Sequence, residues 1–390
     1  MTDSTGLALT RLTLTNFRNY SGLRLDVSAR LIALSGPNGA GKTNLLEAIS
    51  LLTPGRGLRG ASFDELANLQ NASSWAIAAE VATPHHEVKL GTGWSVAAGE
   101  ADGATAGRLV LIDGHLQKGS GALGEYMRML WLTPAMDRLF AGPAGDRRRF
   151  LDRLVATFDP EHSSRVAVFE KVMRERNLLL QEPRADSVWL GSLEAHMAEA
   201  SVAIAAARLA AVEALQKHIH ETRSASAFPW GEISIDGEIE TLVSAMPAVR
   251  AEDEYRRMLA DSRFPDRAAG RALKGTHRSD FIVVHGPKSM PASQCSTGEQ
   301  KALLIGLILA QARAVKAVAN LPPVLLLDEV AAHLDRQRRE GLFATLEALG
   351  SQAWMTGTDG HLFEGLGRGA QCFHVEAGTL AEMKRKDATR

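Results

Sequence analysis

One stretch near the start of the sequence decides the fold: Gly36-Pro37-Asn38-Gly39-Ala40-Gly41-Lys42-Thr43. It matches the phosphate-loop pattern G-x-x-x-x-G-K-[ST] at every fixed position. A short apolar run, residues 30–34, precedes it, and a segment with helical spacing, residues 44–52, follows it. The loop is therefore expected to join a buried strand to the N-terminus of a helix.

The residue types of this loop suit the phosphates of a nucleotide. Glycines let the backbone wrap closely, so that successive N–H groups point at the β-phosphate, and the helix N-terminus adds partial positive charge. Lys42 is expected to reach the β- and γ-phosphates, and the Thr43 hydroxyl to bind Mg²⁺. The alternative is a glycine-rich turn that matches by chance, which the flanking strand and helix disfavour. The sequence therefore predicts that Gly36 to Thr43 bind ATP with Mg²⁺.

A second part of the site is predicted far along the chain. Residues 324–327 are a continuous apolar run, typical of a strand buried on both faces, and they end in Asp328-Glu329. As a Walker B strand, this segment would hold Mg²⁺ through a water molecule bound by Asp328, together with Thr43, and Glu329 would polarise the attacking water as general base. Lys42 is the other predicted catalytic residue. The alternative is a core strand that ends in acidic residues, which are common strand terminators.

A third string, Ser296-Thr297-Gly298-Glu299-Gln300, opens an apolar helix about 30 residues before Asp328. It resembles the S-x-G-x-Q signature of ABC proteins, and a helix N-terminus suits an anion. The alternative is a simple cap, with Ser296 or Thr297 capping and an acid or amide in the first turn. The position before Asp328-Glu329 favours the signature.

Asp335 falls where ABC proteins carry their D-loop, in the string His333-Leu334-Asp335. In ABC proteins the signature of one protomer closes on the phosphate loop of another. The resemblance therefore implies that Ser296, Gly298 and Asp335 complete the nucleotide site in an ATP-dependent homodimer.

The rest of the chain reads as an α/β core interrupted by helices. Strand signals lie at residues 7–25, 75–112, 233–235, 281–284 and 353–356, and helical patterns at 161–181, 193–222 and 255–272. Asp159 is the expected N-cap of the first long helix. We predict an ABC-type P-loop ATPase head with an antiparallel β subdomain and a short, coiled-coil-like helical arm. The predicted segments are 1–155 and 273–390 for the two halves of the head and 156–272 for the arm.

Composition is that of an ordinary soluble protein, with 45% apolar residues, 23% charged residues and a net charge of −1. The longest apolar run, residues 302–310, is about half of the roughly 18 residues that a membrane helix needs. No signal-peptide pattern begins the chain, and Cys295 and Cys372 form no C-x-x-C pair. We expect a cytoplasmic protein with no membrane partner, no disulfide scaffold and no zinc site.

Further motifs resemble the RecF family over nearly the whole chain. Residues 14–20 look like the opening motif of that family, residues 133–152 like its lid region, and His277-Arg278-Ser279-Asp280 like its H-R-x-D stretch. A short arm completes the resemblance. The sequence departs from the pattern at Thr276, where proline is usual. No glutamine stands out as the Q-loop residue, for which Gln117 is the candidate, and the switch position offers only Thr356 or Thr358.

The resemblance implies a function in DNA repair. RecF-like proteins bind ATP, dimerise on it, and bind DNA that is single-stranded, gapped or at a junction. With RecO and RecR they help to load RecA during recombinational repair and replication restart, which SOS induction needs. The expected protein is therefore an ATP-dependent DNA-binding protein whose weak, DNA-stimulated ATPase acts as a switch.

Any DNA contact must come from local basic residues, because the net charge is near zero. The 5% share of aromatic residues favours contacts to the DNA backbone over stacking on bases. The alternative for each arginine is an ordinary ion pair on a solvated face. The candidates on head and arm are Arg56, Arg59, Arg147, Arg148, Arg174, Arg176, Arg256 and Arg257.

Three other functions fit parts of the sequence less well. A transporter-type energy subunit has no use for the long insertion between Thr43 and Ser296. An SMC-like chromosome-organising ATPase needs longer arm helices than the roughly 20–30 residues expected here, at 1.5 Å per residue. A small-molecule kinase would not need the signature helix.

Overall fold

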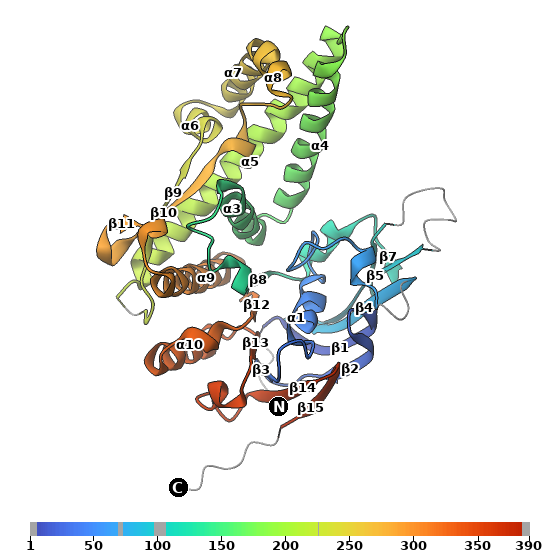
Figure 1. Ribbon diagram of the computed structural model, residues 1–390, viewed down its shortest axis with the longest axis vertical. Coiled ribbons are helices and arrows are strands. Elements are labelled where there is room, and N and C mark those ends of the chain that lie inside the picture. Colours follow the sequence, from blue (N-terminus) through green and yellow to red (C-terminus); the bar gives the residue numbers. More distant parts are fainter. Residues whose placement is uncertain (1–5, 69–72, 97–106, 225, 384–390) are drawn as a thin grey trace. The chain divides into compact units, whose positions relative to one another are not determined.

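The computed structural model describes residues 6–68, 73–96, 107–224 and 226–383. The chain forms two compact units (Figure 1). The head unit comprises the described parts of Met1–Asp137, Ala225–Phe228 and Ile308–Arg390, and the arm unit comprises Arg138–Ser224 and Pro229–Leu307. These units divide the chain at other points than the three predicted segments, because residues 138–155 and 273–307 pack with the arm helices.

A largely parallel sheet forms the centre of the head unit. Its strand order is β15-β14-β3-β13-β12-β8, and only the β14–β15 pair is antiparallel. The four strands β3, β13, β12 and β8 are buried along their whole length, and most of their residues are apolar. The bounds are β3 (Leu31–Ser35), β8 (Met129–Leu132), β12 (Val324–Leu327), β13 (Ala353–Gly357), β14 (Gln371–Glu376) and β15 (Thr379–Glu382).

A second, antiparallel sheet belongs to the same unit and has the order β2-β1-β4-β5-β6-β7. Its strands alternate buried and exposed residues, so one face packs inward and the other faces solvent. The turn between the first two strands is only Arg18-Asn19. The bounds are β1 (Ala8–Phe17), β2 (Tyr20–Asp26), β4 (Ser74–Ala82), β5 (Glu87–Ser95), β6 (Leu109–Ile112) and β7 (His115–Leu116).

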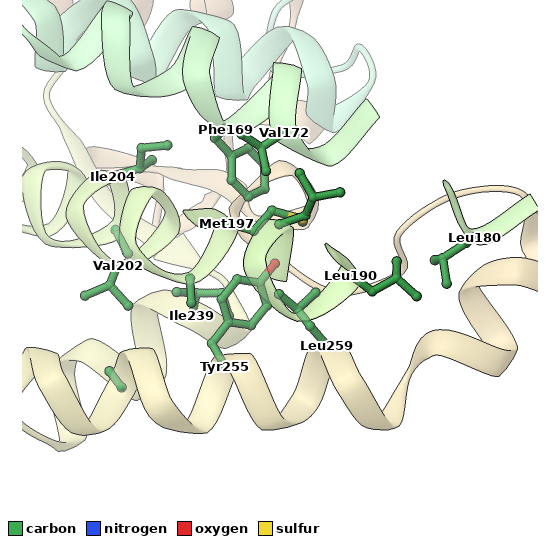
Figure 2. Close-up of a cluster of buried hydrophobic side chains, with 14 of the residues drawn as sticks. Phe169, Val172, Leu180, Leu190, Met197, Val202, Ile204, Ile239, Tyr255 and Leu259 are labelled. Atoms are coloured by element: carbon green, nitrogen blue, oxygen red, sulfur yellow. The ribbon is translucent and has the colours of Figure 1, made fainter. Parts of the chain in front are cut away.

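The arm unit is built mainly from helices. They are α3 (Ala144–Phe158), α4 (His162–Gln181), α5 (Ser187–Thr222), α6 (Glu238–Ala245), α7 (Ala248–Asp261) and α8 (Arg263–Ala269). A three-stranded antiparallel sheet of β9 (Gly231–Asp236), β10 (Asp280–His285) and β11 (Met290–Pro291) belongs to the same unit. Met197 of α5 lies between Phe169 of α4 and Tyr255 of α7 in the apolar core (Figure 2). The arm is thus a packed helical body with its own core.

Three helix predictions in the arm differ from the structure. The segment expected as one helix over 255–272 is two helices, α7 and α8, with Ser262 between them. The second long helix begins at Ser187 and not at 193, because the Asp186 carboxylate accepts the N–H of Val188 at 2.8 Å and caps the helix. Asp159 is not the N-cap of the first long helix. It ends α3, a helix that the sequence pattern did not reveal, and its carboxylate accepts the Glu161 N–H at 3.1 Å.

The remaining long helix, α9 (Thr297–Ala319), begins in the arm unit and ends in the head unit. With 23 residues it extends well beyond the predicted run 302–310. It is the one helix among the described residues whose length and composition would allow it to cross a membrane, and 67% of its apolar window is buried within the protein. The head unit also contains α1 (Lys42–Ser50) and α10 (Arg336–Leu349).

Candidate nucleotide site and basic residues

The phosphate loop lies between β3 and α1, as predicted from the sequence. Two of its glycines are required by close contacts as well as by backbone conformation. A Cβ on Gly36, at φ 148°, would lie 2.2 Å from the carbonyl oxygen of Val375. A Cβ on Gly41, at φ 116°, would lie 2.5 Å from Asn19 Nδ2. Side chains at either position would force the loop open.

The turn between β1 and β2 braces this loop. Asn19 Nδ2 donates to the carbonyl of Ala40 at 3.1 Å, and the Tyr20 hydroxyl donates to the carbonyl of Gly41 at 3.1 Å. The N–H of Gly378 also donates to the Ala40 carbonyl, at 3.1 Å. Tyr20 is fully enclosed, and burial raises the pKa of its hydroxyl. The family's opening motif therefore has a physical role here, which is to hold the loop in shape.

Lys42, the first residue of α1, lies folded back into the phosphate loop. Its ammonium donates to the carbonyls of Gly36 at 2.7 Å and Pro37 at 2.8 Å, and the side chain is buried. Burial lowers the pKa of Lys42, while the nearby carboxylates of Glu329 and Asp328 oppose this shift. The ammonium is thus held where negatively charged phosphate oxygens would satisfy it better than neutral carbonyls.

Thr43 and Asp328, more than half the chain apart in sequence, meet beside the loop. The Thr43 hydroxyl is 2.9 Å from Asp328 Oδ1 and 3.0 Å from Oδ2. Neighbouring ligands of an octahedral Mg²⁺ ion, with bonds of about 2.0–2.1 Å, are separated by about 2.9 Å. Two hard oxygen ligands at this spacing fit Mg²⁺.

Glu329 follows Asp328 in the left-handed region, with φ 51°. Its N–H donates to the hydroxyl of Thr356 at 2.8 Å, and that hydroxyl donates to Asp328 Oδ1 at 2.6 Å. Of the two switch candidates, the structure thus brings Thr356 to the acidic pair, while Thr358 is exposed after the end of β13. Gln117 lies after β7 and donates its amide to the His115 carbonyl at 3.0 Å.

Ser296 caps α9. The Ser296 N–H donates to Glu299 Oε2 at 3.0 Å, and the Glu299 N–H donates to Ser296 Oγ at 3.4 Å, which is a reciprocal capping box. Lys288 also pairs with Glu299, and the two partners lower the pKa of that carboxyl to about 2. Ser296, Thr297 and Gly298 are exposed. The first turn therefore presents N–H groups that have no partner within the helix.

Asp335 caps α10 in the head unit. Its carboxylate accepts the N–H of Arg338 at 2.8 Å, and its side chain is 60% exposed. Asp335 therefore has a local structural role in this chain, and its exposed carboxylate remains accessible to another molecule.

The candidate DNA contacts separate into several environments. Arg176 was wrongly predicted as a DNA contact: its side chain is 0% exposed and lies within the arm core. Arg174, Arg256 and Arg257 are exposed, each beside an acid on its own helix, and Arg56 is also exposed. Arg59 donates to Asn44 and pairs with Glu47 beside α1.

Arg147 and Arg148 join two of the family motifs within the arm unit. Arg147 binds the carboxylate of Asp280 through two nitrogens, both at 2.7 Å, and Arg148 donates to the carbonyl of Ser279 at 2.7 Å. The lid motif on α3 is thus attached to the H-R-x-D stretch at the start of β10. These arginines have a structural function within the arm unit, in place of the ordinary ion pair on a solvated face that the sequence left open as the alternative.

The fold and the site together define a class: an ATPase head of the ABC and SMC type. The sequence matches the family described as RecF/RecN/SMC N terminal domain over residues 8–380. The SMC head domain from Pyrococcus furiosus, in complex with ScpA, has the same fold, with a TM-score of 0.53 and 15% identity over 97% of this chain and 96% of that one.

The family can be stated more closely. The DNA replication and repair protein RecF of Mesorhizobium japonicum is 50% identical over 372 residues, which cover 95% of this chain and 97% of that protein. RecF of Brucella suis is 48% identical over 96% of both chains. A structure has also been solved of RecF, described as a recombination mediator protein of the RecFOR pathway, together with ATPrS. It matches this chain with a TM-score of 0.84 and 22% identity over 97% of this chain and 99% of that one. The chain belongs to the RecF family of DNA replication and repair proteins.

Proposed function

We propose that this protein binds ATP with Mg²⁺ in its head unit and uses ATP to switch between a monomer and a DNA-binding dimer. One observation carries the proposal: Lys42 lies inside a braced phosphate loop while Thr43 and Asp328 converge beside it at 2.9 Å. A RecF structure has been solved with ATP, and its fold matches this chain with a TM-score of 0.82. The likeness supports the same ligand here.

Each residue of the site has a distinct task in this proposal. The loop N–H groups and Lys42 bind the phosphates and offset the charge that develops on the γ-phosphoryl group. Thr43 and Asp328 would hold Mg²⁺, which would supply positive charge against the phosphates. Glu329 accepts a hydrogen bond from the attacking water and orients it. Because the site does no covalent chemistry of its own, hydrolysis depends on how well these groups are positioned.

The exposed N-terminus of α9 gives a reason for a dimer. Ser296 and Gly298 are exposed there, and a phosphate group on another protomer would accept the Ser296 hydroxyl and the N–H groups of the first turn that have no partner within the helix. ATP would then act as a ligand that binds the dimer more tightly than the monomer and so shifts the population towards it. Asp335, exposed at the start of α10, is proposed to contact the same shared nucleotide.

Membership of the RecF family supports a proposal for the cellular role. We propose that the dimer binds single-stranded, gapped or junction DNA in the cytoplasm and, with RecO and RecR, helps to load RecA during recombinational repair, replication restart and SOS induction. The longest arm helix, α5, has 36 residues, so it spans only about 54 Å. An arm of this length suits local DNA contact better than the long-range bridging of an SMC-like protein.

Sedimentation velocity tests the ATP switch. Wild type and Glu329→Gln are compared without nucleotide, with ADP and with ATP. ATP alone is expected to produce the dimer, and Glu329→Gln should keep it for at least about 10 times longer, because removing a general base slows hydrolysis by roughly 100-fold or more. Glu87→Gln, at the exposed start of β5, should behave as wild type. If ATP binds and the mass does not change, Ser296 and Gly298 are only a helix cap.

DNA affinity should depend strongly on salt. A protein that neutralises 6–10 phosphates loses about 10³–10⁵ in affinity between 50 and 200 mM salt. For the ATP-bound Glu329→Gln dimer we expect a loss of at least about 100-fold over that range, measured by fluorescence anisotropy on a gapped duplex. Arg56 is exposed, and Arg56→Ala should reduce the slope with which the DNA affinity falls as the salt concentration rises. An affinity that is independent of salt would contradict binding through the DNA backbone.

A further inference from the structure

Thr356 occupies a place in the sheet that connects it to both residues of the acidic pair, Asp328 and Glu329. It lies on β13, between β3 on one side and β12 on the other. Met355 is the register partner of Leu327, so the next residue on each strand brings Thr356 beside Asp328. On the other side, Thr356 is the register partner of Leu34, two residues before the phosphate loop. Its exposed fraction is 0%, so solvent does not compete for its hydroxyl.

The hydrogen bonds of this hydroxyl have a defined direction. A hydroxyl has one proton, and Thr356 donates it to Asp328 Oδ1 at 2.6 Å. Its oxygen then accepts the N–H of Glu329 at 2.8 Å. These two hydrogen bonds therefore link the Glu329 backbone through Thr356 to the Asp328 carboxylate. The same carboxylate accepts the Thr43 hydroxyl at 2.9 Å.

We propose that Thr356 is a positioning residue for the ATPase site, which orients the Asp328 carboxylate towards Thr43 and holds the Glu329 backbone in its left-handed turn. The proposal rests on the ATP-binding function proposed above and assigns Thr356 no contact with the nucleotide. It acts through Asp328, which would hold Mg²⁺, and through Glu329, which would orient the water.

Two physical reasons require a hydroxyl at this position. A non-glycine residue at φ 51° is disfavoured and persists only where its surroundings hold it there, and the Thr356 oxygen is the group that binds the Glu329 N–H. The Asp328 carboxylate is buried, and the orientation of such a ligand depends on the groups that bind its oxygens. Valine has the shape of threonine but would remove both hydrogen bonds and leave the Glu329 N–H and one Asp328 oxygen without this partner.

The test compares Thr356→Val, Thr356→Ser and wild type, with Thr345→Val as matched control. Thr345 lies on α10, and its hydroxyl donates to the backbone carbonyl of Gly341 in the same helix, at 2.8 Å. Thr356→Val is expected to lower kcat by about 10–100-fold, the usual effect of losing a group that orients a metal ligand. It should also lose the gain in ATP affinity that Mg²⁺ gives, while its ATP affinity in EDTA stays as in wild type.

Serine distinguishes positioning from packing. Thr356→Ser keeps both hydrogen bonds and loses only a methyl group, so its kcat and its Mg²⁺ effect should stay within about threefold of wild type. If Thr356→Ser loses as much as Thr356→Val, the methyl contact is what matters and the inference is wrong. It is equally wrong if Thr356→Val keeps the wild-type kcat and Mg²⁺ effect.

A crystal structure of Thr356→Val tests the inference without nucleotide. Asp328 is expected to turn away from Thr43, and Glu329 to leave the left-handed region. Unchanged geometry at both residues would overturn the inference even if ATP binds as proposed. Failure of wild type to bind ATP would instead refute the proposed function, and the crystal structure would still decide the role of Thr356.

Discussion

Replacing Lys42 by methionine is expected to weaken ATP binding by about 100-fold or more and to keep the protein monomeric in ATP. The ammonium already lies inside the loop, 2.7 Å from the Gly36 carbonyl and 2.8 Å from that of Pro37. Hydrogen bonds to charged groups contribute about 1.5–3 kcal/mol each, so losing two of them to phosphate oxygens costs about 3–6 kcal/mol. Titration of a fluorescent ATP analogue, followed by sedimentation velocity, measures both effects.

Lys301 provides no suitable control for this experiment, because it is buried in α9, but Lys89 does. Lys89 is an exposed lysine on β5, and Lys89→Met should bind the analogue as wild type does. The free energy of unfolding of Lys42→Met should also be measured, because the methionine must fit a loop shaped by the lysine. Wild-type affinity in a folded Lys42→Met variant would show that this loop does not bind phosphate.

Replacing Arg176 by methionine is expected to destabilise the arm unit by about 3–5 kcal/mol, the usual cost of removing one partner from a buried ion pair. Arg176 donates to Glu194 at 3.0 Å, to Asp266 at 2.7 Å and to the Leu259 carbonyl at 2.7 Å. All three ionic side chains are at most 1% exposed. Without the guanidinium, the carboxylates of Glu194 and Asp266 stay buried, and Glu194 keeps Arg263 as its cationic partner.

Differential scanning calorimetry measures this effect as a drop of about 6–20 °C in the melting temperature of the arm transition. Arg174→Met is the matched control, two residues earlier on the same helix. Arg174 is 65% exposed and lies 3.9 Å from Glu170, so its loss should change the free energy of unfolding by less than about 0.5 kcal/mol. Equal melting temperatures for the two variants would mean that the buried arginine does not stabilise the arm.

The contrast between these two arginines shows the limit of a sequence pattern. Arg174-Glu175-Arg176 has alternating charge, which is typical of a solvated helix face. Arg176 can be buried because it forms ion pairs with Glu194 and Asp266, which are 18 and 90 residues away in the sequence. Neither partner is visible from the sequence around Arg176, so the pattern placed a core residue on a DNA-binding surface.

Other differences have the same origin. Ser296 and Glu299 form the capping box that the sequence kept open as an alternative, and only the coordinates show both hydrogen bonds made. The sequence offered Thr356 or Thr358 for the switch position without choosing. The parallel pairing of β12 with β13 brings Thr356, and not Thr358, to the acidic pair.

The sequence by itself determined the phosphate loop, the apolar strand ending in Asp328-Glu329, the α/β class of the head and the two long arm helices. Each of these is a local pattern whose physical cause, such as a glycine turn, an apolar run or a helical period, lies within a few consecutive residues. Only the tertiary structure decided that Arg176 is buried, that Arg147 joins the lid motif to Asp280, and that Thr356 binds both Walker B residues. These contacts join residues far apart in sequence, and burial and hydrogen bonding depend on which segments the fold brings together.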